Sequence, residues 1–237
     1  MPEDKNWALK IEGLQAWYGE SHVLHGVGIR VQQGELVTLL GRNGAGKTTT
    51  MKCIMGLVAR RSGSIAINGI ETIELPSRKI ARIGMGYVPE ERGIYSSMNV
   101  RENLLLPPVI AEGGMTLDEI FELFPNLKAR LESQGTKLSG GEQQMLAMAR
   151  VLRTGARILL LDEPTEGLAP VIVDQIHSLI KRLKTRGFTI LLVEQNFRFA
   201  TTLADRHYIV EEGAVVDELD NAELLRDEQR VLRHLGV

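Results

Sequence analysis

Residues 41–48 read Gly41-Arg42-Asn43-Gly44-Ala45-Gly46-Lys47-Thr48, and they organise the rest of the chain. The octapeptide fits the pattern G-x-x-x-x-G-K-[ST], in which a glycine-rich loop surrounds a chain of phosphates with backbone N–H groups. The apolar run 35–40 before it predicts a buried strand, and residues 48–55 after it predict a helix. The positive end of that helix then also faces the phosphates. The stretch therefore predicts a site for a nucleoside triphosphate.

The residues of this loop have separate expected roles. Gly44 and Gly46 permit close approach of the backbone, Lys47 is expected to bridge the β- and γ-phosphates, and the Thr48 hydroxyl is expected to bind Mg²⁺. A glycine-rich turn with an accidental Lys-Thr pair is the competing interpretation, and the strand-to-helix context disfavours it. The remaining predicted nucleotide contacts are Gly41, Arg42, Asn43, Ala45 and Thr49.

Composition limits the classes of function. The chain has 237 residues, of which 43% are hydrophobic and 24% charged, as in a soluble globular protein of one large domain or two small ones. Its net charge of −2 gives no general attraction to nucleic acid or anionic lipid. The single cysteine, Cys53, excludes an internal disulfide, fits a reducing compartment and is predicted to be a buried packing residue.

The sequence lacks the signals of membrane insertion or export. No apolar stretch reaches the roughly 18 residues that a membrane span needs. Residues 1–6 have neither the basic nor the apolar region of a signal peptide. We therefore expect a cytoplasmic chain that reaches a membrane only through a partner.

The residues on either side of the loop predict a layer of antiparallel strands. Residues 7–12 and 23–31 alternate apolar and polar side chains, as half-buried strands do. Residues 61–64 predict a turn into a further strand and hairpin at 65–69. Between the first two strands, the ring of Tyr18 is expected to stack on adenine, and packing in the core is an equally good interpretation.

A loop and a helical insertion follow. Pro89 and Gly93 mark a loop in which Glu90 either reaches a bound metal or lies in solvent as an ordinary acid. From residue 98 to 136 the pattern becomes helical, with a break at Pro125. We expect a mostly helical insertion here.

A second motif reads Leu138-Ser139-Gly140-Gly141-Glu142-Gln143-Gln144 and opens a helix. Ser139 and Glu142, three positions apart, form a capping box, and the two glycines between them expose the amides of the helix start. By itself this stretch predicts either a plain helix cap or a second phosphate site.

A third motif reads Arg157-Ile158-Leu159-Leu160-Leu161-Asp162-Glu163-Pro164. Its apolar run predicts a central parallel strand that delivers two carboxylates at its C-terminal end, where open α/β sheets bind ligands. Asp162 is expected to hold Mg²⁺ through water, and Glu163 to polarise the attacking water. A strand end exposed to solvent is the alternative.

The last third of the chain predicts further helices and strands. Residues 171–186 have helical spacing, and residues 188–193 form the next apolar strand. Two closing strands follow, joined by a turn at Gly213. Asn221 is expected to cap one final helix that runs to Leu235.

Taken together, the P-loop, the segment 138–144 and the strand ending in Asp162-Glu163 resemble the ATP-binding subunits of ABC transporters, over about residues 9–235. The resemblance implies an α/β fold: a P-loop NTPase core of the ABC ATPase type, with a mostly parallel sheet and helices. An antiparallel β subdomain and a helical subdomain, inserted at roughly 95–150, complete it. Residues 1–237 would then form a single ABC ATP-binding domain.

The resemblance also implies roles for individual residues. Tyr18 matches the aromatic residue that stacks on adenine. Ser139, Gly140, Gly141 and Glu142 match the signature that contacts the γ-phosphate held by a second, head-to-tail subunit. ATP would close this dimer and hydrolysis would release it. The implied catalytic residues are Lys47, Glu90, Glu163 and Gln195, and the implied metal ligands are Thr48, Glu90 and Asp162.

The chain departs from the family pattern at three places. Glu90 stands where the lid loop usually has Gln, so that the lid contact becomes acidic. Gln195 stands where the switch residue is usually His, and it can hydrogen-bond a phosphate but cannot titrate near neutral pH. Residues 166–170 read Glu-Gly-Leu-Ala-Pro where the family usually has Asp, which puts the usual cross-dimer signalling residue in doubt.

These departures resemble one subfamily, the ATPase subunits of high-affinity branched-chain amino acid importers of the LivF type. The matching motifs are Tyr-Val-Pro-Glu, Glu-Gly-Leu-Ala-Pro and Leu-Val-Glu-Gln-Asn. The resemblance implies ATP and Mg²⁺ as cofactors and a peripheral place on the cytoplasmic face of the inner membrane. Its implied partners are a second ATPase subunit in a homo- or heterodimer, two transmembrane permease subunits and, indirectly, a periplasmic solute-binding protein. Nucleic acid is not among them, and the sequence does not name the solute.

Two other functions remain open from the sequence. A soluble, non-transport ABC ATPase would act on ribosomes or DNA, but such proteins commonly carry two cassettes or long coiled-coil insertions. The missing His keeps open a nucleotide-gated dimerisation module with weak hydrolysis. For an importer, the lid loop near Glu90 and the helical insertion are expected to form the groove that receives a permease helix.

Overall fold

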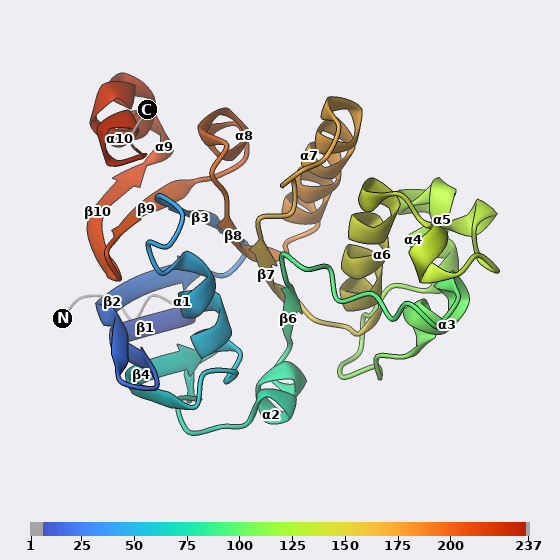
Figure 1. Cartoon of the computed structure of the whole chain (residues 1–237), viewed down its shortest axis with the longest axis horizontal. Coiled ribbons are helices and arrows are strands. Elements are labelled where there is room, and N and C mark those ends of the chain that lie inside the picture. Colours follow the sequence, from blue (N-terminus) through green and yellow to red (C-terminus); the bar gives the residue numbers. More distant parts are fainter. Residues whose placement is uncertain (1–6, 236–237) are drawn as a thin grey trace.

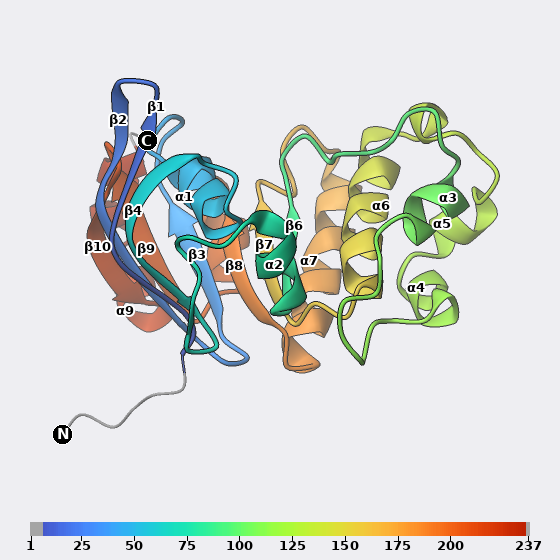
Figure 2. The same cartoon turned by 90° about the horizontal axis from the view of Figure 1, so that it is seen from below.

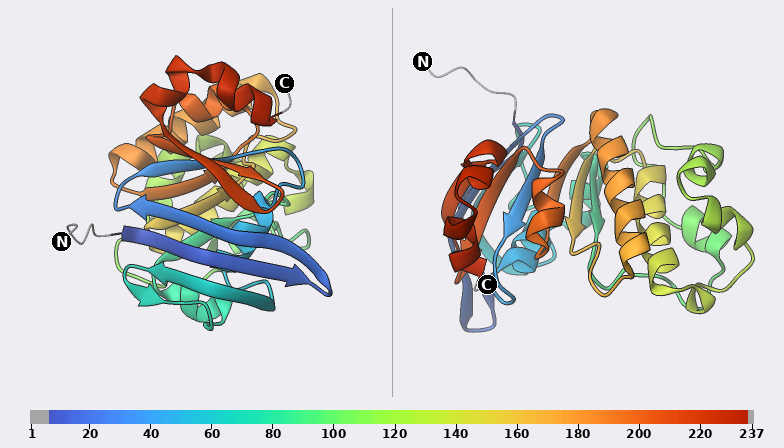
Figure 3. Two further views of the ribbon diagram at one scale, coloured as in Figure 1. Left: turned by 90° about the vertical axis from the view of Figure 1, so that its left-hand side faces the viewer. Right: turned by 90° about the horizontal axis from the view of Figure 1, so that it is seen from above.

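Two β-sheets and a separate group of helices make up the structure (Figure 1). The computed structural model describes residues 7–235, with the side chains of all of these except residues 231, 232 and 235. The antiparallel strands lie at one end of the molecule and the short helices from the middle of the chain lie at the other (Figure 3). The predicted α/β class is confirmed.

The larger sheet has six strands in the order β10–β9–β3–β8–β7–β6. Each neighbouring pair is parallel except β10 and β9. The C-terminal ends of β3, β8 and β7 therefore meet at one edge, where sheets of this kind bind ligands. The strands are β3 Leu36–Leu40, β6 Met85–Val88, β7 Ile158–Asp162, β8 Thr189–Val193, β9 Arg206–Glu211 and β10 Ala214–Asp220.

The three central strands are buried on both faces. Every residue of β3, β7 and β8 is buried. Along β7, Leu159 and Leu161 belong to the core shared with the helical part of the chain, whereas Ile158 and Leu160 belong to the core shared with the second sheet. Cover on both faces explains why these strands are continuous apolar runs without alternation.

The smaller sheet is antiparallel, in the order β2–β1–β4–β5. Helix α1 (Lys47–Ile54) shares its core with both sheets, through Met51, Cys53 and Ile54. Cys53 is buried as predicted, and burial raises the pKa of its thiol to about 12. The strands are β1 Trp7–Tyr18, β2 Ser21–Gln32, β4 Arg60–Ile67 and β5 Ile70–Glu71.

The predicted turn at residues 61–64 is wrong, because β4 begins at Arg60 and runs through them. Gly63 has a φ of +107°, and a Cβ there would lie 2.6 Å from the carbonyl oxygen of Gly13 in β1. Glycine at this position allows two strands to approach closely, and it does not end either of them. Similarly, β1 continues through Tyr18, so the aromatic stretch is the end of a strand and not a connection between strands.

A group of helices lies on the side of the larger sheet that faces away from the antiparallel sheet (Figure 2). Its buried side chains, such as Leu104, Ile120 and Leu127, join the core on the helical face of the larger sheet. The helices are shorter than the pattern suggested, because Thr116 caps a new helix and Pro125 starts another. The group comprises α3 Val100–Leu105, α4 Leu117–Leu123, α5 Pro125–Ala129, the 3₁₀ turn Gly135–Lys137 and α6 Gly140–Arg153.

The prediction of one final helix capped by Asn221 is wrong. Asp220 is the cap, because its carboxylate accepts the Glu223 N–H at 2.7 Å and the Glu223 side chain accepts the Asp220 N–H in return. The chain leaves helical geometry at Asp227, and two helices result. The helices outside the group described above are α2 Ser77–Arg82, α7 Pro170–Thr185, α8 Phe197–Thr201, α9 Asn221–Arg226 and α10 Glu228–Leu235.

The turn between β9 and β10 makes a close contact that can be tested. Gly213 has a φ of +78°, and a Cβ there would lie 2.0 Å from the Val23 carbonyl oxygen. We expect Gly213→Ala to lower the free energy of unfolding by at least about 3 kcal/mol, because a steric clash adds to the strain of a left-handed alanine. Urea unfolding measures this loss.

Gly187→Ala is the matched control. Gly187 has nearly the same φ, +79°, but no described atom lies within 4 Å of its added Cβ. This variant is expected to lose only the conformational strain, about 1–2 kcal/mol. Equal losses in the two variants would contradict the close approach at Gly213.

Candidate nucleotide-binding site

The glycine-rich loop lies between β3 and α1 and packs against the β9–β10 hairpin. The Ala45 carbonyl accepts the Gly213 N–H at 2.9 Å. A Cβ at Gly41 would lie 2.2 Å from the Val210 carbonyl oxygen, so only glycine fits there. Gly46, with a φ of +105°, opens α1 without a side-chain cap. The first amides of the helix therefore remain available to an anion.

Lys47 is buried inside its own loop, with 4% of its surface exposed. Its Nζ donates to the carbonyl oxygens of Gly41 and Arg42 at 2.8 and 2.9 Å, and lies 3.8 Å from Glu163 Oε1. Burial lowers the pKa of Lys47, and the surrounding carboxylates, Glu163 first among them, oppose this change. The ammonium is thus held beside the acid at the end of β7.

Asp162 ends β7 fully buried, and each of its carboxylate oxygens accepts a hydroxyl. The Thr48 hydroxyl donates to Oδ1 at 3.1 Å, and the Tyr87 hydroxyl donates to Oδ2 at 2.9 Å. Burial raises the pKa of Asp162, and these two hydrogen bonds oppose the rise. The carboxylate is therefore fixed in one orientation from two sides.

Thr48 and Asp162 together offer the hard oxygen donors that Mg²⁺ prefers. Within residues 7–235 no group of three or more His, Cys, Asp or Glu side chains is arranged to hold a metal alone. Mg²⁺ commonly takes one or two protein ligands and completes its shell with phosphate oxygens and water. The pair therefore fits an ion that arrives together with a nucleotide.

Glu163 follows β7 with strained backbone geometry. Its φ is +45°, in the left-handed region that non-glycine residues rarely adopt. Two hydrogen bonds hold it there: its N–H donates to the Val193 carbonyl at 3.0 Å, and Gln195 Nε2 donates to its Oε2 at 2.6 Å. Burial raises the pKa of its carboxyl. Strain of this kind persists where the surroundings enforce it, and it is common at functional sites.

One cavity of about 450 Å³ brings most of the predicted residues together. Glu90 reaches it from the loop after β6, and Gln195 from the loop after β8. Glu90, Glu163 and the P-loop therefore share one space, whereas Asp162 does not line the cavity and reaches it through the Thr48 hydroxyl. The lining residues are Val23, Asn43, Gly44, Gly46, Lys47, Thr48, Thr49, Glu90, Glu163, Glu166 and Gln195.

The segment 138–144 lies elsewhere, at the start of α6 (Figure 1). The predicted capping box is confirmed, since Ser139 Oγ accepts the Glu142 N–H and the Glu142 carboxylate accepts the Ser139 N–H at 2.8 Å. A Cβ at Gly141 would lie 2.7 Å from Ile172 in α7, which explains that glycine by packing. None of residues 139–142 lines the cavity in this chain.

Tyr18 lies at the end of β1 with half of its surface exposed, and it is not among the residues that line the cavity. The neighbouring Trp17 is engaged: it stacks on His22 with ring centroids 4.5 Å apart, and the Arg60 guanidinium carbon lies over the Trp17 ring, 4.9 Å from its centroid. Core packing, the competing interpretation for Tyr18, does not fit so exposed a ring. Its contact with adenine stays a prediction.

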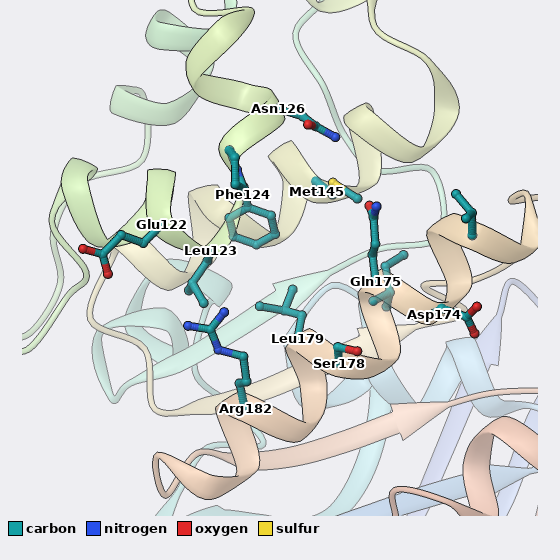
Figure 4. A pocket seen from close by; sticks show the side chains of 13 residues that line it. Glu122, Leu123, Phe124, Asn126, Met145, Asp174, Gln175, Ser178, Leu179 and Arg182 are labelled. Carbon is teal, nitrogen blue, oxygen red and sulfur yellow. The ribbon is translucent and has the colours of Figure 1, made fainter.

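A larger hollow of about 590 Å³ lies between α7 and the helices α4, α5 and α6 (Figure 4). Leu123, Phe124, Met145 and Leu179 give it a largely apolar lining. None of the residues predicted to bind nucleotide or metal, or to act in catalysis, lines it. An apolar surface does not suit a triphosphate, so the phosphate chemistry belongs to the smaller cavity.

Sequence reasoning missed several residues of the site. Tyr87 holds Asp162, and Glu194 accepts the Thr165 hydroxyl at 2.5 Å beneath Gln195. Glu166 lines the cavity beside Glu163. The sequence signals for these residues were weak: Tyr87 is a tyrosine just before the predicted loop, and Glu194 is an acid directly after an apolar strand. Only the parallel pairing of β6, β7 and β8 shows that they meet.

A family model described as ABC transporter matches residues 24–166 of this chain. The matched segment includes the P-loop, the segment 138–144 and the two acids after β7, and it covers more than half of the chain. The chain therefore belongs to the ABC transporter family, as one of its ATP-hydrolysing, ATP-binding subunits.

Relatives within this family extend over nearly the whole chain. The high-affinity branched-chain amino acid transport ATP-binding protein BraG of Pseudomonas aeruginosa is 42% identical over 96% of this chain and 99% of its own length. A probable branched-chain amino acid transport ATP-binding protein, LivF of Archaeoglobus fulgidus, is 36% identical over 97% and 99%. The lipopolysaccharide export system ATP-binding protein LptB of Haemophilus influenzae is 35% identical over 96% and 97%.

Solved structures show the same fold. An ATP-binding subunit of an ABC transporter superposes with a TM-score of 0.83 at 27% identity, covering 97% of this chain and all of the other. A dimeric ATP-binding cassette in a post-hydrolysis state with ADP and Pi gives 0.79 at 25% identity, covering 90% and 98%. Among the described residues no helix is long and apolar enough to span a bilayer.

Proposed function

We propose that this chain powers a bacterial ABC importer of branched-chain amino acids or related solutes by hydrolysing ATP. The observation that carries the proposal is the single cavity shared by the P-loop, Lys47 and Glu163, with Asp162 beside it. The solute class is supported by the 42% identity to BraG over almost the full length of both chains. Residues 1–237 act as one ABC ATP-binding domain, with a helical subdomain at roughly 95–150.

The P-loop holds the phosphate chain of ATP. Asn43, Gly44 and residues 46–49 line the cavity at the positive end of α1, where their amides can surround an anion. Gly41, Arg42 and Ala45 shape the loop behind them, and the Ala45 N–H donates to the Arg42 carbonyl at 3.1 Å. Lys47 exchanges the two carbonyl oxygens it now contacts for the β- and γ-phosphates. This exchange is favourable because a buried ammonium interacts more strongly with phosphate than with carbonyl dipoles.

The metal site uses Thr48 and Asp162, with Glu90 above them from the lid loop. Mg²⁺, when bound there, would neutralise charge on the β- and γ-phosphates. Such a cation suits this cavity, because four carboxylates lie around one lysine: those of Glu90, Asp162, Glu163 and Glu194. The Tyr87 hydroxyl keeps the Asp162 carboxylate oriented toward Thr48.

Hydrolysis requires a base for the attacking water, and Glu163 supplies it. Its raised pKa makes it a better proton acceptor than an exposed carboxylate. Gln195 holds the carboxylate by a hydrogen bond of 2.6 Å and contacts the γ-phosphate with the rest of its amide. Tyr18, half exposed at the end of β1, stacks on adenine.

A second ATPase subunit, identical or closely related, completes the site. Residues 139–142 do not line the cavity of their own chain. They form the start of a helix of 14 residues, where Ser139 is the cap and the first two helical residues are glycines. In a head-to-tail dimer they contact the γ-phosphate held by the partner. A dimeric cassette among the structural neighbours supports this arrangement.

Two permease subunits and, through them, a periplasmic solute-binding protein are the further partners. The chain then lies on the cytoplasmic face of the inner membrane as a peripheral subunit. Exposed apolar side chains in the lid loop and in the segment that follows it support a contact with a permease helix: Tyr95 at 51% exposure, Leu105 at the end of α3 at 46% and Val109 at 59%. No part of the proposal involves nucleic acid.

The nearest competing function is transport of a different solute. LptB, a protein of lipopolysaccharide export, is 35% identical over most of this chain, so the cassette alone does not choose the cargo. A dimerisation module with weak hydrolysis is disfavoured by the strained, partly buried Glu163, whose carboxylate lies 3.8 Å from Lys47 Nζ. Mass spectrometry of the proteins that copurify with the chain from membranes should identify the permease. If only ribosomal proteins copurify, a soluble, non-transport ABC ATPase is favoured instead.

Glu163→Gln tests the catalytic assignment. The change keeps the shape of the side chain and removes the base, so kcat for ATP hydrolysis should fall at least about 10²-fold while ATP binding persists. Phosphate release by the purified chain measures this. Glu166→Gln is the matched control, because Glu166 lines the same cavity and is exposed. Steady ATP turnover in Glu163→Gln would contradict the assignment of Glu163 as the base.

The pH dependence of kcat/KM follows from the Glu163 pKa, because kcat/KM reports ionisations of the nucleotide-free chain. The working form is the carboxylate, and burial raises its pKa above the ordinary value of 4.5, so kcat/KM should fall as pH drops through a midpoint above 4.5. Gln195 does not titrate and adds no limb of its own. In Gln195→His a second ionisation should appear near neutral pH. A wild-type profile flat down to pH 4 would exclude Glu163 as the base.

Cross-linking tests the permease contact. Cysteines placed at Ser96 or Met98, beside the lid loop, should form products with a permease subunit in membranes. The native Cys53 gives little background, because its buried thiol has a pKa of about 12 and stays protonated. Ser62→Cys, exposed on the antiparallel sheet, is the matched control and should give no product. Cross-linked products from Ser62→Cys, with none from the cysteines at Ser96 and Met98, would contradict the proposed site of permease contact.

A further inference from the structure

Glu194 is a buried carboxylate that none of the roles above employs directly. Only 3% of its surface is exposed, although acids are seldom buried unless they are paired. It accepts three hydrogen bonds: from the Thr165 hydroxyl at 2.5 Å, and from the N–H groups of Gln195 and Asn196 at 3.2 Å each. All of these partners belong to two loops at the edge of the nucleotide cavity.

These contacts form a closed ring that includes the proposed base, Glu163. Gln195 follows Glu194 in the chain, and its side-chain amide donates to Glu163 Oε2 at 2.6 Å. Thr165 lies two residues after Glu163 and donates to Glu194. The loop after β7 and the loop after β8 are thus joined twice, once at the carboxylate that faces the cavity and once behind it.

The ring connects two of the places where this chain departs from the family pattern. Gln195 occupies the switch position, and Thr165 immediately precedes the stretch 166–170 that lacks the usual Asp. Without Glu194, the buried Thr165 hydroxyl and the backbone N–H groups of Gln195 and Asn196 would lose their shared acceptor, and the side-chain contact that joins the two loops behind the cavity would be gone. The orientation of the Gln195 side-chain amide therefore depends on the hydrogen bonds that Glu194 accepts behind it.

We propose that Glu194 is a positioning residue which, together with Thr165, orients the side-chain amide of Gln195 toward the Glu163 carboxylate. The proposal rests on the proposed function, because it assumes that Glu163 is the base. Glu194 acts by accepting hydrogen bonds and not by its charge. A glutamine in its place would satisfy the same groups, since its oxygen accepts the two backbone N–H groups and its NH₂ donates to the Thr165 hydroxyl.

Four variants of the full chain separate these roles. Thr165→Val removes the hydroxyl but keeps the shape, and Glu194→Leu removes the acceptor. Each should lower kcat about tenfold or more, with KM for ATP within about twofold, because a small misplacement of a catalytic group has large effects. Thr165→Ser and Glu194→Gln are the conservative partners and should keep kcat within about threefold of the wild type.

The decisive comparison is made in a Gln195→Ala background. If Thr165 acts through Gln195, Thr165→Val should cause no further loss of kcat there. The same fold-loss in both backgrounds, or an unchanged kcat in the wild-type background, would overturn the proposal. Thr165→Val carries the test even where Glu194→Leu does not fold, because its side chain is the same size.

Hydrogen exchange gives a readout that does not depend on turnover. Thr165→Val should speed exchange in peptides covering residues 163–168 and 194–196 together, whereas Thr165→Ser should not. Exchange that stays unchanged in both peptides would contradict the ring. Full turnover in Glu163→Gln would instead defeat the proposed function, and the two failures are thereby distinguished.

Discussion

Three adjacent strands that are buried on both faces, β3, β8 and β7, are the constraint on which the site depends. Packing on two sides fixes their register, and their ends then set the places of three loops. Thr48 therefore meets Asp162 at 3.1 Å across 114 residues of sequence, and Gln195 meets Glu163 at 2.6 Å across 32. The reacting side chains lie at the strand ends or in the segments that directly follow them, and the sheet sets their positions.

Local motifs were predicted well from the sequence because the signal for each one lies within a short stretch of residues. The P-loop pattern, the continuous apolar strands and the Ser139 capping box are all of this kind. Contacts between distant segments were missed, as with Tyr87 on Asp162 and Thr165 on Glu194, since no periodicity records which strands become neighbours. The wrong turn at residues 61–64 has a related cause: Gly63 serves a close approach to β1 that only the folded chain shows.

One chain assembles only part of the predicted site. The phosphate loop, the acids Glu90 and Glu163, and Gln195 share a cavity, whereas residues 139–142 lie at the start of α6, in the part of the molecule away from the antiparallel sheet (Figure 2). Lys47 is bonded to its own loop at 2.8 and 2.9 Å, so it has to change partners before it can hold a phosphate. A cassette built in this way can couple ATP to the approach of two subunits, because neither half is complete alone.

The most direct test is a structure of the full chain with ATP and Mg²⁺, trapped in the Glu163→Gln variant. The account predicts that Lys47 Nζ leaves Gly41 and Arg42 and lies within hydrogen-bonding distance, about 3 Å, of the β- and γ-phosphates. Ser139 of a facing copy should lie at the γ-phosphate. A P-loop that binds no nucleotide, or a Ser139 helix remote from the phosphates in every pairing of copies, would contradict it.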